Sequence, residues 1–173
     1  MTGTGFEIER KWLLSEAPSA GDLRALGARA IRIEQVYLRP TPSAPVRRIR
    51  RSEGGGLTEC AYTEKAALSG IVREERERPI DPAEYARLLA EADAGRRPVR
   101  KTRHVFRYGG NVLELDVFEQ PPNLVLLEIE FDREDAPEPA LPAQLRVVRE
   151  VSSDPSYLNV NLAQWGFDPT RDG

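Results

Sequence analysis

The sequence is poor in the residues that several kinds of protein depend on. It has one cysteine, Cys60, and one histidine, His104, among 173 residues, which excludes an internal disulfide and a metal cluster built on thiolates. Its longest apolar runs are only a few residues, too short for a helix that crosses a bilayer. The first five residues have neither the basic segment nor the apolar segment of a secretory signal. We therefore expect a cytoplasmic protein that does not act in a membrane.

An excess of charge of one sign is also lacking. The 25 basic and 28 acidic residues give a formal net charge of -3, which argues against broad electrostatic binding to nucleic acid or to anionic lipid. Charged residues are nevertheless abundant, at 31% of the chain, so local patches of both signs can form. The length fits one domain spanning residues 1–173, which we expect to be a monomer or a homodimer.

Alternation of polar and apolar residues predicts eight strands. They cover residues 6–14, 31–39, 46–52, 58–66, 71–80, 97–108, 111–118 and 124–132. Helices are expected at about 19–27, from Pro82 to about Gly95, and from Pro155 to about Gly166. In the second, Asp81 serves as N-cap before the proline, and Asp154-Pro155 opens the third. The fold class is therefore α+β, with an antiparallel sheet as its main component.

Charged residues alternate with apolar ones along nearly every predicted strand. Because residues i and i+2 of a strand point to the same face, these charges fall into sets that share a face. The acidic members are Glu7, Glu9, Glu75, Glu77, Glu114, Asp116, Glu128 and Glu130, and the basic members are Lys11, Arg48, Arg50, Lys65, Arg73, Lys101 and Arg103. On a single strand, such a pattern usually marks the solvated face of a half-buried sheet. Here most sets have one sign, although like charges repel, which favours ligands or cross-strand partners.

The two kinds of charge indicate a particular chemistry if the charged face is turned inward. Carboxylates bind hard divalent cations such as Mg²⁺ and Mn²⁺, and arginine and lysine bind the oxygens of a multiply charged anion. A site for a polyphosphate and its cations needs both carboxylates and basic side chains. Cations and bases together would neutralise a transferring phosphoryl group during hydrolysis. On a further strand, Gln35, Tyr37 and Arg39 share a face, and a hydrogen bond from Tyr37 to the substrate is an open alternative.

The order of these sets resembles that of the CYTH superfamily, also called triphosphate tunnel metalloenzymes. Residues 7–11 read Glu-Ile-Glu-Arg-Lys, similar to the Glu-x-Glu-x-Lys hallmark of that family. The later blocks follow in the order of the family: paired arginines at 48 and 50, Thr-x-Lys at 63–65, Glu-x-Glu at 75–77, Lys-x-Arg at 101–103, Glu-x-Asp-x-Phe at 114–118 and Glu-x-Glu at 128–130. With matches at 35–38 and 150–159, the resemblance extends from residue 7 to about residue 163.

The resemblance implies a closed eight-stranded antiparallel β-barrel, a tunnel with a charged interior and a few helices packed outside. It implies that catalysis depends on Glu7, Glu9, Lys11, Glu128 and Glu130. It further implies Mg²⁺ or Mn²⁺ as cofactor, with the metal ligands Glu7, Glu9, Asp116, Glu128 and Glu130. The substrate-binding residues would be Lys11, Arg48, Arg50, Lys65, Arg73, Lys101 and Arg103. Glu75 and Glu77 would either order the basic residues or contact metal.

The predicted function is divalent-metal-dependent hydrolysis of a triphosphate-containing small molecule, with inorganic triphosphate as the first choice. Two enzymatic alternatives use a similar interior: a thiamine or nucleoside triphosphatase, and a class IV-type adenylyl cyclase, which would also have to bind adenine. The non-enzymatic alternative is a module that binds polyphosphate or nucleotide. The complete acid pairs on the first and last predicted strands argue against it, because binding alone needs the bases more than the metal ligands.

Overall fold

The computed structural model describes the backbone of residues 3–69 and 72–172 and the side chains of residues 8–65 and 74–170. Its strands are β1 (Gly3–Leu14), β2 (Arg29–Leu38), β3 (Val46–Gly54), β4 (Leu57–Ser69), β5 (Val72–Ile80), β6 (Val99–Tyr108), β7 (Asn111–Gln120), β8 (Val125–Glu130) and β9 (Val147–Glu150). Its α-helices are α1 (Ala20–Ala25), α2 (Pro82–Leu88) and α3 (Asn159–Trp165), and short 3₁₀ helices cover Leu89–Glu91, Pro155–Tyr157 and Pro169–Asp172. All eight predicted strands are present, close to their expected bounds.

Capping residues next to the predicted helices determine where these helices begin and end. The Asp81 side chain accepts a hydrogen bond from the Glu84 amide at 2.7 Å, and Pro82 occupies the first position of α2. At the end of α3, Gly166 has a φ of 75°, a conformation that glycine adopts at low cost. The helices are shorter than predicted, because α2 passes into a 3₁₀ turn and the segment after Asp154 begins with another.

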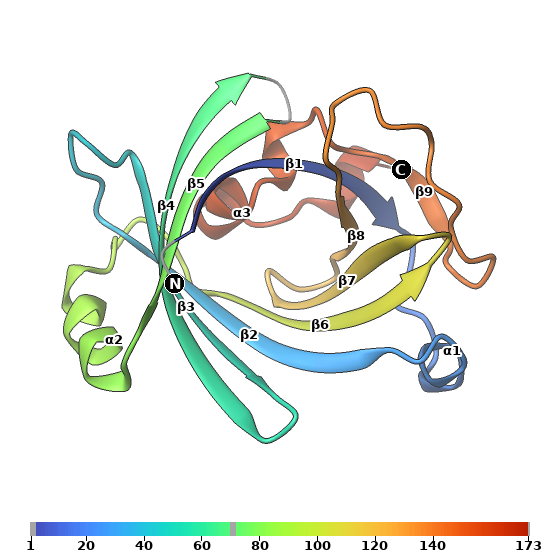
Figure 1. Ribbon diagram of the computed structural model, residues 1–173, viewed down its shortest axis with the longest axis horizontal. Helices are drawn as coiled ribbons and strands as arrows, with labels where there is room; N and C mark the ends of the chain where they lie inside the picture. Colours follow the sequence, from blue (N-terminus) through green and yellow to red (C-terminus); the bar gives the residue numbers. More distant parts are fainter. Residues whose placement is uncertain (1–2, 70–71, 173) are drawn as a thin grey trace.

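The strands form one antiparallel sheet in the order β5-β4-β3-β2-β6-β7-β8-β1-β9, and β1 also pairs with β5. Figure 1 shows the strands bending round, so that one face of the sheet is turned inward. The prediction of eight strands was short by one. Strand β9 pairs only with the end of β1, and its four residues are all exposed, so the alternation that reveals the other strands is missing.

The outer face of the sheet carries two apolar clusters and two of the helices. Leu23 of α1 packs against a cluster that includes Trp12, Phe106 and Leu127. Tyr85 of α2 packs with a cluster that includes Leu38. These two helices lie outside the sheet, as predicted.

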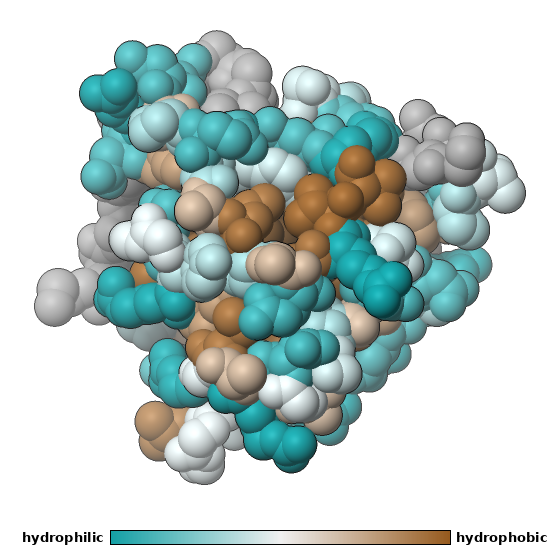
Figure 2. Space-filling model, turned by 90° about the vertical axis from the view of Figure 1, so that its right-hand side faces the viewer, coloured by the Kyte–Doolittle hydropathy of each residue, from teal (hydrophilic) through white to brown (hydrophobic). Residues whose placement is uncertain are grey.

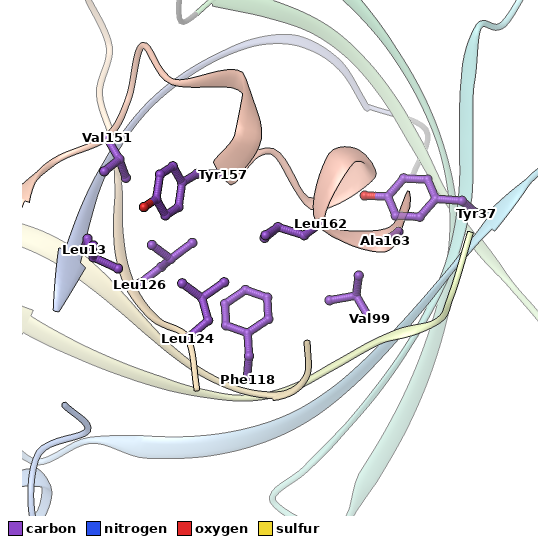
Figure 3. Packing of buried hydrophobic residues seen from close by; sticks show 10 residues of the cluster. All are labelled: Leu13, Tyr37, Val99, Phe118, Leu124, Leu126, Val151, Tyr157, Leu162 and Ala163. Carbon is purple, nitrogen blue, oxygen red and sulfur yellow. The ribbon is translucent and has the colours of Figure 1, made fainter. Parts of the chain in front are cut away.

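Helix α3 lies on the inner face, so the prediction that the helices pack outside is wrong for this element. Leu162 and Ala163 of α3 and the nearby Tyr157 pack on inward side chains of the strands and of the residue just before β8: Leu13, Tyr37, Val99, Phe118, Leu124 and Leu126 (Figure 3). This third cluster fills one end of the inner face. The physical reason is that β1, β6, β7 and β8 change from charged to apolar residues along the same face, and β2 adds Tyr37 at the apolar end. Together they give an amphipathic segment a surface to cover.

The outside of the molecule mixes polar and apolar residues. On the side where β9 lies, apolar residues reach the surface among polar ones (Figure 2), and Val147 and Val148 of β9 are 37% and 48% exposed. Within the part of the chain that is described, no helix has both the length and the apolar character needed to span a membrane.

Candidate active site

The inner face of the sheet lines an open cavity of about 850 Å³ next to the apolar end. Fifteen charged residues were predicted to share this face, and the side chains of thirteen are described. Eleven of these line the cavity: Glu9, Lys11, Arg48, Arg50, Lys65, Glu75, Glu77, Arg103, Glu114, Glu128 and Glu130. The side chains of Glu7 and Arg73 lie outside the described residues. Their backbones are partners in the register of β1 and β5.

One part of the cavity, the acidic wall, is formed by Glu9, Glu114, Glu128, Glu130 and Asp132 on or next to β1, β7 and β8. The strand register places acids directly opposite each other, Glu9 against Glu130 and Glu114 against Glu128. Like charges in such pairs repel and destabilise a sheet. The arrangement therefore needs cations close by.

Lys11 and Arg103 supply part of this compensation. The Lys11 Nζ atom lies 2.6 Å from Glu9 Oε1 and 2.6 Å from Glu128 Oε1. Arg103 donates to Glu128 Oε2 at 2.7 Å and also contacts Glu114. Burial alone would raise the pKa of Glu128, but Lys11, Lys101 and Arg103 hold it well below its ordinary value. Glu128 is thus an ionised, buried carboxylate with both oxygens bound to bases.

Glu114 has a different environment. Burial raises its pKa above the ordinary value, although Arg103 opposes this, and the neighbouring Glu128, Asp116 and Glu9 raise it further. The acidic wall therefore contains a carboxyl group that is costly to ionise in this state. A cation bound among these acids would favour ionisation of Glu114.

The basic wall lies on β3, β4 and β5 and consists of Arg48, Arg50 and Lys65, held by Glu75 and Glu77. Lys65 Nζ lies 2.8 Å from Glu75 Oε2, and Arg50 donates to Glu77 Oε1 at 2.8 Å. Arg48 lies 3.6 Å from Glu75. Burial lowers the pKa of Arg50, and the neighbouring Arg48 adds to this. Of the two alternatives for Glu75 and Glu77, these contacts favour the ordering of bases.

Lys101 and Asp116 differ from the other predicted site residues because neither lines the cavity. Both side chains are completely buried and form an ion pair with each other. Asp116 also accepts two hydrogen bonds from Arg103, from Nε at 2.7 Å and from one terminal nitrogen at 2.8 Å. Asp116 thus holds the guanidinium of Arg103 on the side away from the cavity, and Lys101 in turn holds Asp116. In this state the charges of Lys101 and Asp116 are used within this ion-pair network, and phosphate binding by Lys101 and metal ligation by Asp116 stay predictions.

Several lining residues were not among the predicted site residues. Asp132 continues the alternation of Glu128 and Glu130 by one further step, so the same pattern could have identified it. Gln35 and Tyr37 line the cavity as well, in agreement with the inward face considered for their strand. Val46 lines it too, two residues before Arg48 on the same face of β3. The remaining contributors are residues 110–112, at the β6–β7 turn and the start of β7, and Leu158, Asn159 and Val160. No local pattern indicates that these segments approach the inner face.

The charges of the cavity fit a divalent cation that is shared with a substrate. Among the described lining residues, seven are acidic and five basic, a formal charge of -2. No group of three histidine, cysteine or acidic side chains in the described part of the chain is arranged to hold a metal alone. Mg²⁺, however, is commonly held by one or two carboxylates together with substrate phosphates. Glu9, Glu130 and Asp132 offer oxygen ligands of this kind.

An antiparallel sheet with separate acidic and basic groups on its inner face is the architecture expected from the sequence motifs, and residues 5–156 match the CYTH domain. The chain belongs to the CYTH domain family, as predicted. It is 31% identical over 161 residues to an inorganic triphosphatase of Acetivibrio thermocellus, and the match covers 92% of this chain and 94% of the relative.

Solved structures agree with this assignment. The crystal structure of the inorganic triphosphatase NE1496 has 31% sequence identity and a TM-score of 0.55, and the match covers 91% of this chain and 94% of that one. The PH1819 protein from Pyrococcus horikoshii has a TM-score of 0.57 at 22% identity, over 75% of this chain and 80% of that one. At this identity the second likeness concerns the fold alone. Both relatives at 31% identity are named inorganic triphosphatases, and triphosphatase activity is what the sequence motifs predicted.

Proposed function

We propose that this protein hydrolyses inorganic triphosphate with the help of a divalent cation, inside the cavity between the acidic and basic walls. The observation that carries the proposal is the charge of the cavity. A triphosphate brings several negative charges to a lining that already has a formal charge of -2. Binding is therefore unfavourable unless cations enter with the substrate. We choose inorganic triphosphate because both relatives at 31% identity are inorganic triphosphatases.

The proposed roles follow the two walls. Arg48, Arg50 and Lys65 bind phosphate oxygens, and Arg73 joins them through its place on β5. Glu9 and Glu130, with Glu7 two residues before Glu9 on β1, hold the Mg²⁺ or Mn²⁺. Lys11 and Arg103 lie between acids and substrate and are anchored by Glu128. The contacts of Asp116 and Lys101 favour a positioning role for this pair, in place of metal ligation and phosphate binding.

The reaction needs one water and no covalent intermediate. The water oxygen forms a bond to a terminal phosphorus, the bond from that phosphorus to the bridging oxygen breaks, and pyrophosphate leaves with the electron pair. The proton that the water loses ends on the released phosphate or in solvent. When bound, the cation neutralises charge on the transferring group and on the leaving group. The bases of the chain hold the remaining phosphate oxygens in line for attack.

A closed tunnel is part of the same proposal. Strand β1 pairs with β8 through residues 9–13 and with β5 through residues 3–8, so it can join the two ends of the β5-to-β8 series. Closure would keep the walls at a fixed separation and limit the entry of bulk water. The cytoplasmic location and the monomeric or homodimeric state stay predictions.

A panel of substrates tests the proposal. Phosphate release would be measured from inorganic triphosphate, thiamine triphosphate and ATP, each with Mg²⁺, with Mn²⁺ and after chelation, with cyclic AMP measured in parallel. We expect the highest kcat/KM with inorganic triphosphate and no turnover after chelation. Formation of cyclic AMP from ATP without release of free phosphate would refute the proposal in favour of a cyclase.

A further inference from the structure

We propose that the side-chain amide of Gln35 orients the water that attacks the triphosphate. This role rests on the proposed function and adds a positioning residue to it. Gln35 lies on β2, where its strand neighbours in the register are Arg50 of β3 and Val99 of β6. Its side chain lines the cavity and the residue is only 2% exposed. The amide is therefore held next to the basic wall, where the phosphates of the substrate are expected.

The carbonyl oxygen of this amide has no hydrogen-bond partner within the part of the chain whose side chains are described. Gln35 Oε1 is buried, and no donor among the described residues reaches it. A buried polar atom without a partner is costly, and an apolar side chain of similar size would fill the same space without that cost. The orphaned oxygen therefore indicates a group kept for a ligand. Asn159 presents a second such oxygen to the cavity, but only Gln35 has an arginine of the basic wall as its strand neighbour.

Other acceptors in this half of the cavity are already engaged. Glu75 accepts from Lys65, and the two oxygens of Glu77 accept from Arg50 and Thr63 at 2.8 and 2.9 Å. The hydroxyl of Tyr37 interacts with Arg48. Among the described residues next to the basic wall, Gln35 Oε1 is the buried acceptor without a donor, and it suits a donor placed against a phosphate bound to Arg48 and Arg50.

Water is the donor that fits. The oxygens of an ionised triphosphate are acceptors and have no hydrogen to give to Gln35 Oε1, whereas the attacking water has two. An amide oxygen is too weakly basic to take the proton. Gln35 therefore orients the water by accepting one hydrogen bond, and the proton leaves with the phosphate or passes to solvent as in the proposed reaction. A rotated amide would instead turn its NH₂ group to the phosphate, and the variants below separate this role from the first.

The experiment compares Gln35→Met, Gln35→Glu and the control Gln164→Met, which makes the same change at an exposed position of α3. For each variant, kcat and KM for inorganic triphosphate, the inhibition constant of pyrophosphate and the thermal unfolding midpoint are measured. We expect Gln35→Met to lower kcat by about 100-fold because the attacking water loses its orientation, with KM and the inhibition constant within about threefold of wild type. Its unfolding midpoint should equal or exceed that of wild type, because an orphaned buried oxygen is removed.

The glutamate variant distinguishes water from phosphate. A carboxylate keeps an acceptor at this place, so Gln35→Glu should recover at least about tenfold in kcat over Gln35→Met if the ligand is water. If the amide binds phosphate, KM and the inhibition constant rise in both variants and Gln35→Glu is the worse of the two. That result would overturn the proposal, as would a normal kcat in Gln35→Met or a clear fall in the unfolding midpoint of both variants. A wild-type protein without triphosphatase activity would overturn the proposed function itself, and the role of Gln35 with it.

Discussion

The buried pair of Lys101 and Asp116 gives a sharp test of how the site is held. Both side chains have 0% exposure, and Asp116 also binds Arg103 through both of its oxygens. Replacing Asp116 with asparagine keeps the shape and removes the charge that Lys101 and Arg103 share. Breaking a buried ion pair from one side costs about 3–5 kcal/mol. At about 2–4 °C per kcal/mol for a chain of this size, the unfolding midpoint of Asp116→Asn should fall by roughly 6–20 °C.

The same variant has a predicted pH dependence. Burial lowers the pKa of Lys101, and Asp116 opposes that effect. Without Asp116 the pKa of the folded state falls further, while the unfolded chain keeps an ordinary value of about 10.4. Between these two values the unfolded state binds more protons, so the stability of the variant should rise with pH up to about 10.4. Urea unfolding at a series of pH values between neutrality and that limit measures the slope.

Two controls make this result decisive. Glu53→Gln removes the acid of an exposed pair with Arg51 and should cost less than about 1 kcal/mol. Adding Lys101→Met to Asp116→Asn should restore part of the lost stability, because the unpaired buried ammonium is removed. A cost for Asp116→Asn no larger than that of Glu53→Gln would refute the reasoning. If Asp116 were a metal ligand instead, the variant would lose the rise in unfolding midpoint that Mn²⁺ produces, which we expect it to keep.

Three further predictions concern the two walls. Glu130→Gln should lower kcat by at least about 100-fold and abolish the Mn²⁺-induced rise in unfolding midpoint; normal turnover would contradict its assignment as a ligand. Arg50→Ala should raise the KM for inorganic triphosphate by about tenfold or more. The control Arg51→Ala alters the neighbouring exposed arginine of β3 and should leave KM unchanged. Equal effects of the two variants on KM would rule out a specific phosphate contact of Arg50. Chelation should abolish turnover and added Mg²⁺ or Mn²⁺ should restore it, and activity in the chelated protein would exclude the metal.

Much of this arrangement could be predicted from the sequence because one physical rule covers it. Strand residues two apart share a face, so Arg48 with Arg50 and Glu128 with Glu130 could be assigned to one surface without knowledge of the fold. The rule does not say how far along the strand the cavity extends. Lys101 stands between Val99 and Arg103, and Asp116 between Glu114 and Phe118. They share the face of the site but lie one step closer to its apolar end, and that depth depends on the packing of α3.

Local sequence patterns could not predict where β9 and α3 lie, for a related reason. Strand β9 is exposed at every residue, so burial leaves no alternation in its sequence. The apolar spacing of Leu158 and Leu162 indicates that α3 needs an apolar surface but does not identify it. Leu13, Val99 and Phe118 form that surface, although each shares a strand face with charged residues. Only the register of all the strands shows that these apolar positions meet at one end.

The contacts of Lys11 explain why metal and substrate should bind together in the proposed site. Lys11 Nζ lies 2.6 Å from both Glu9 and Glu128, so in this state its charge is used to offset repulsion within the acidic wall. A cation on Glu9 would take over part of that compensation and leave the ammonium of Lys11 available to a phosphate oxygen. The substrate in turn supplies ligands that Glu9 and Glu130 alone do not provide. In the proposed site each ligand would therefore lower the electrostatic cost of binding the other, and Lys11 would couple the acidic wall to the triphosphate.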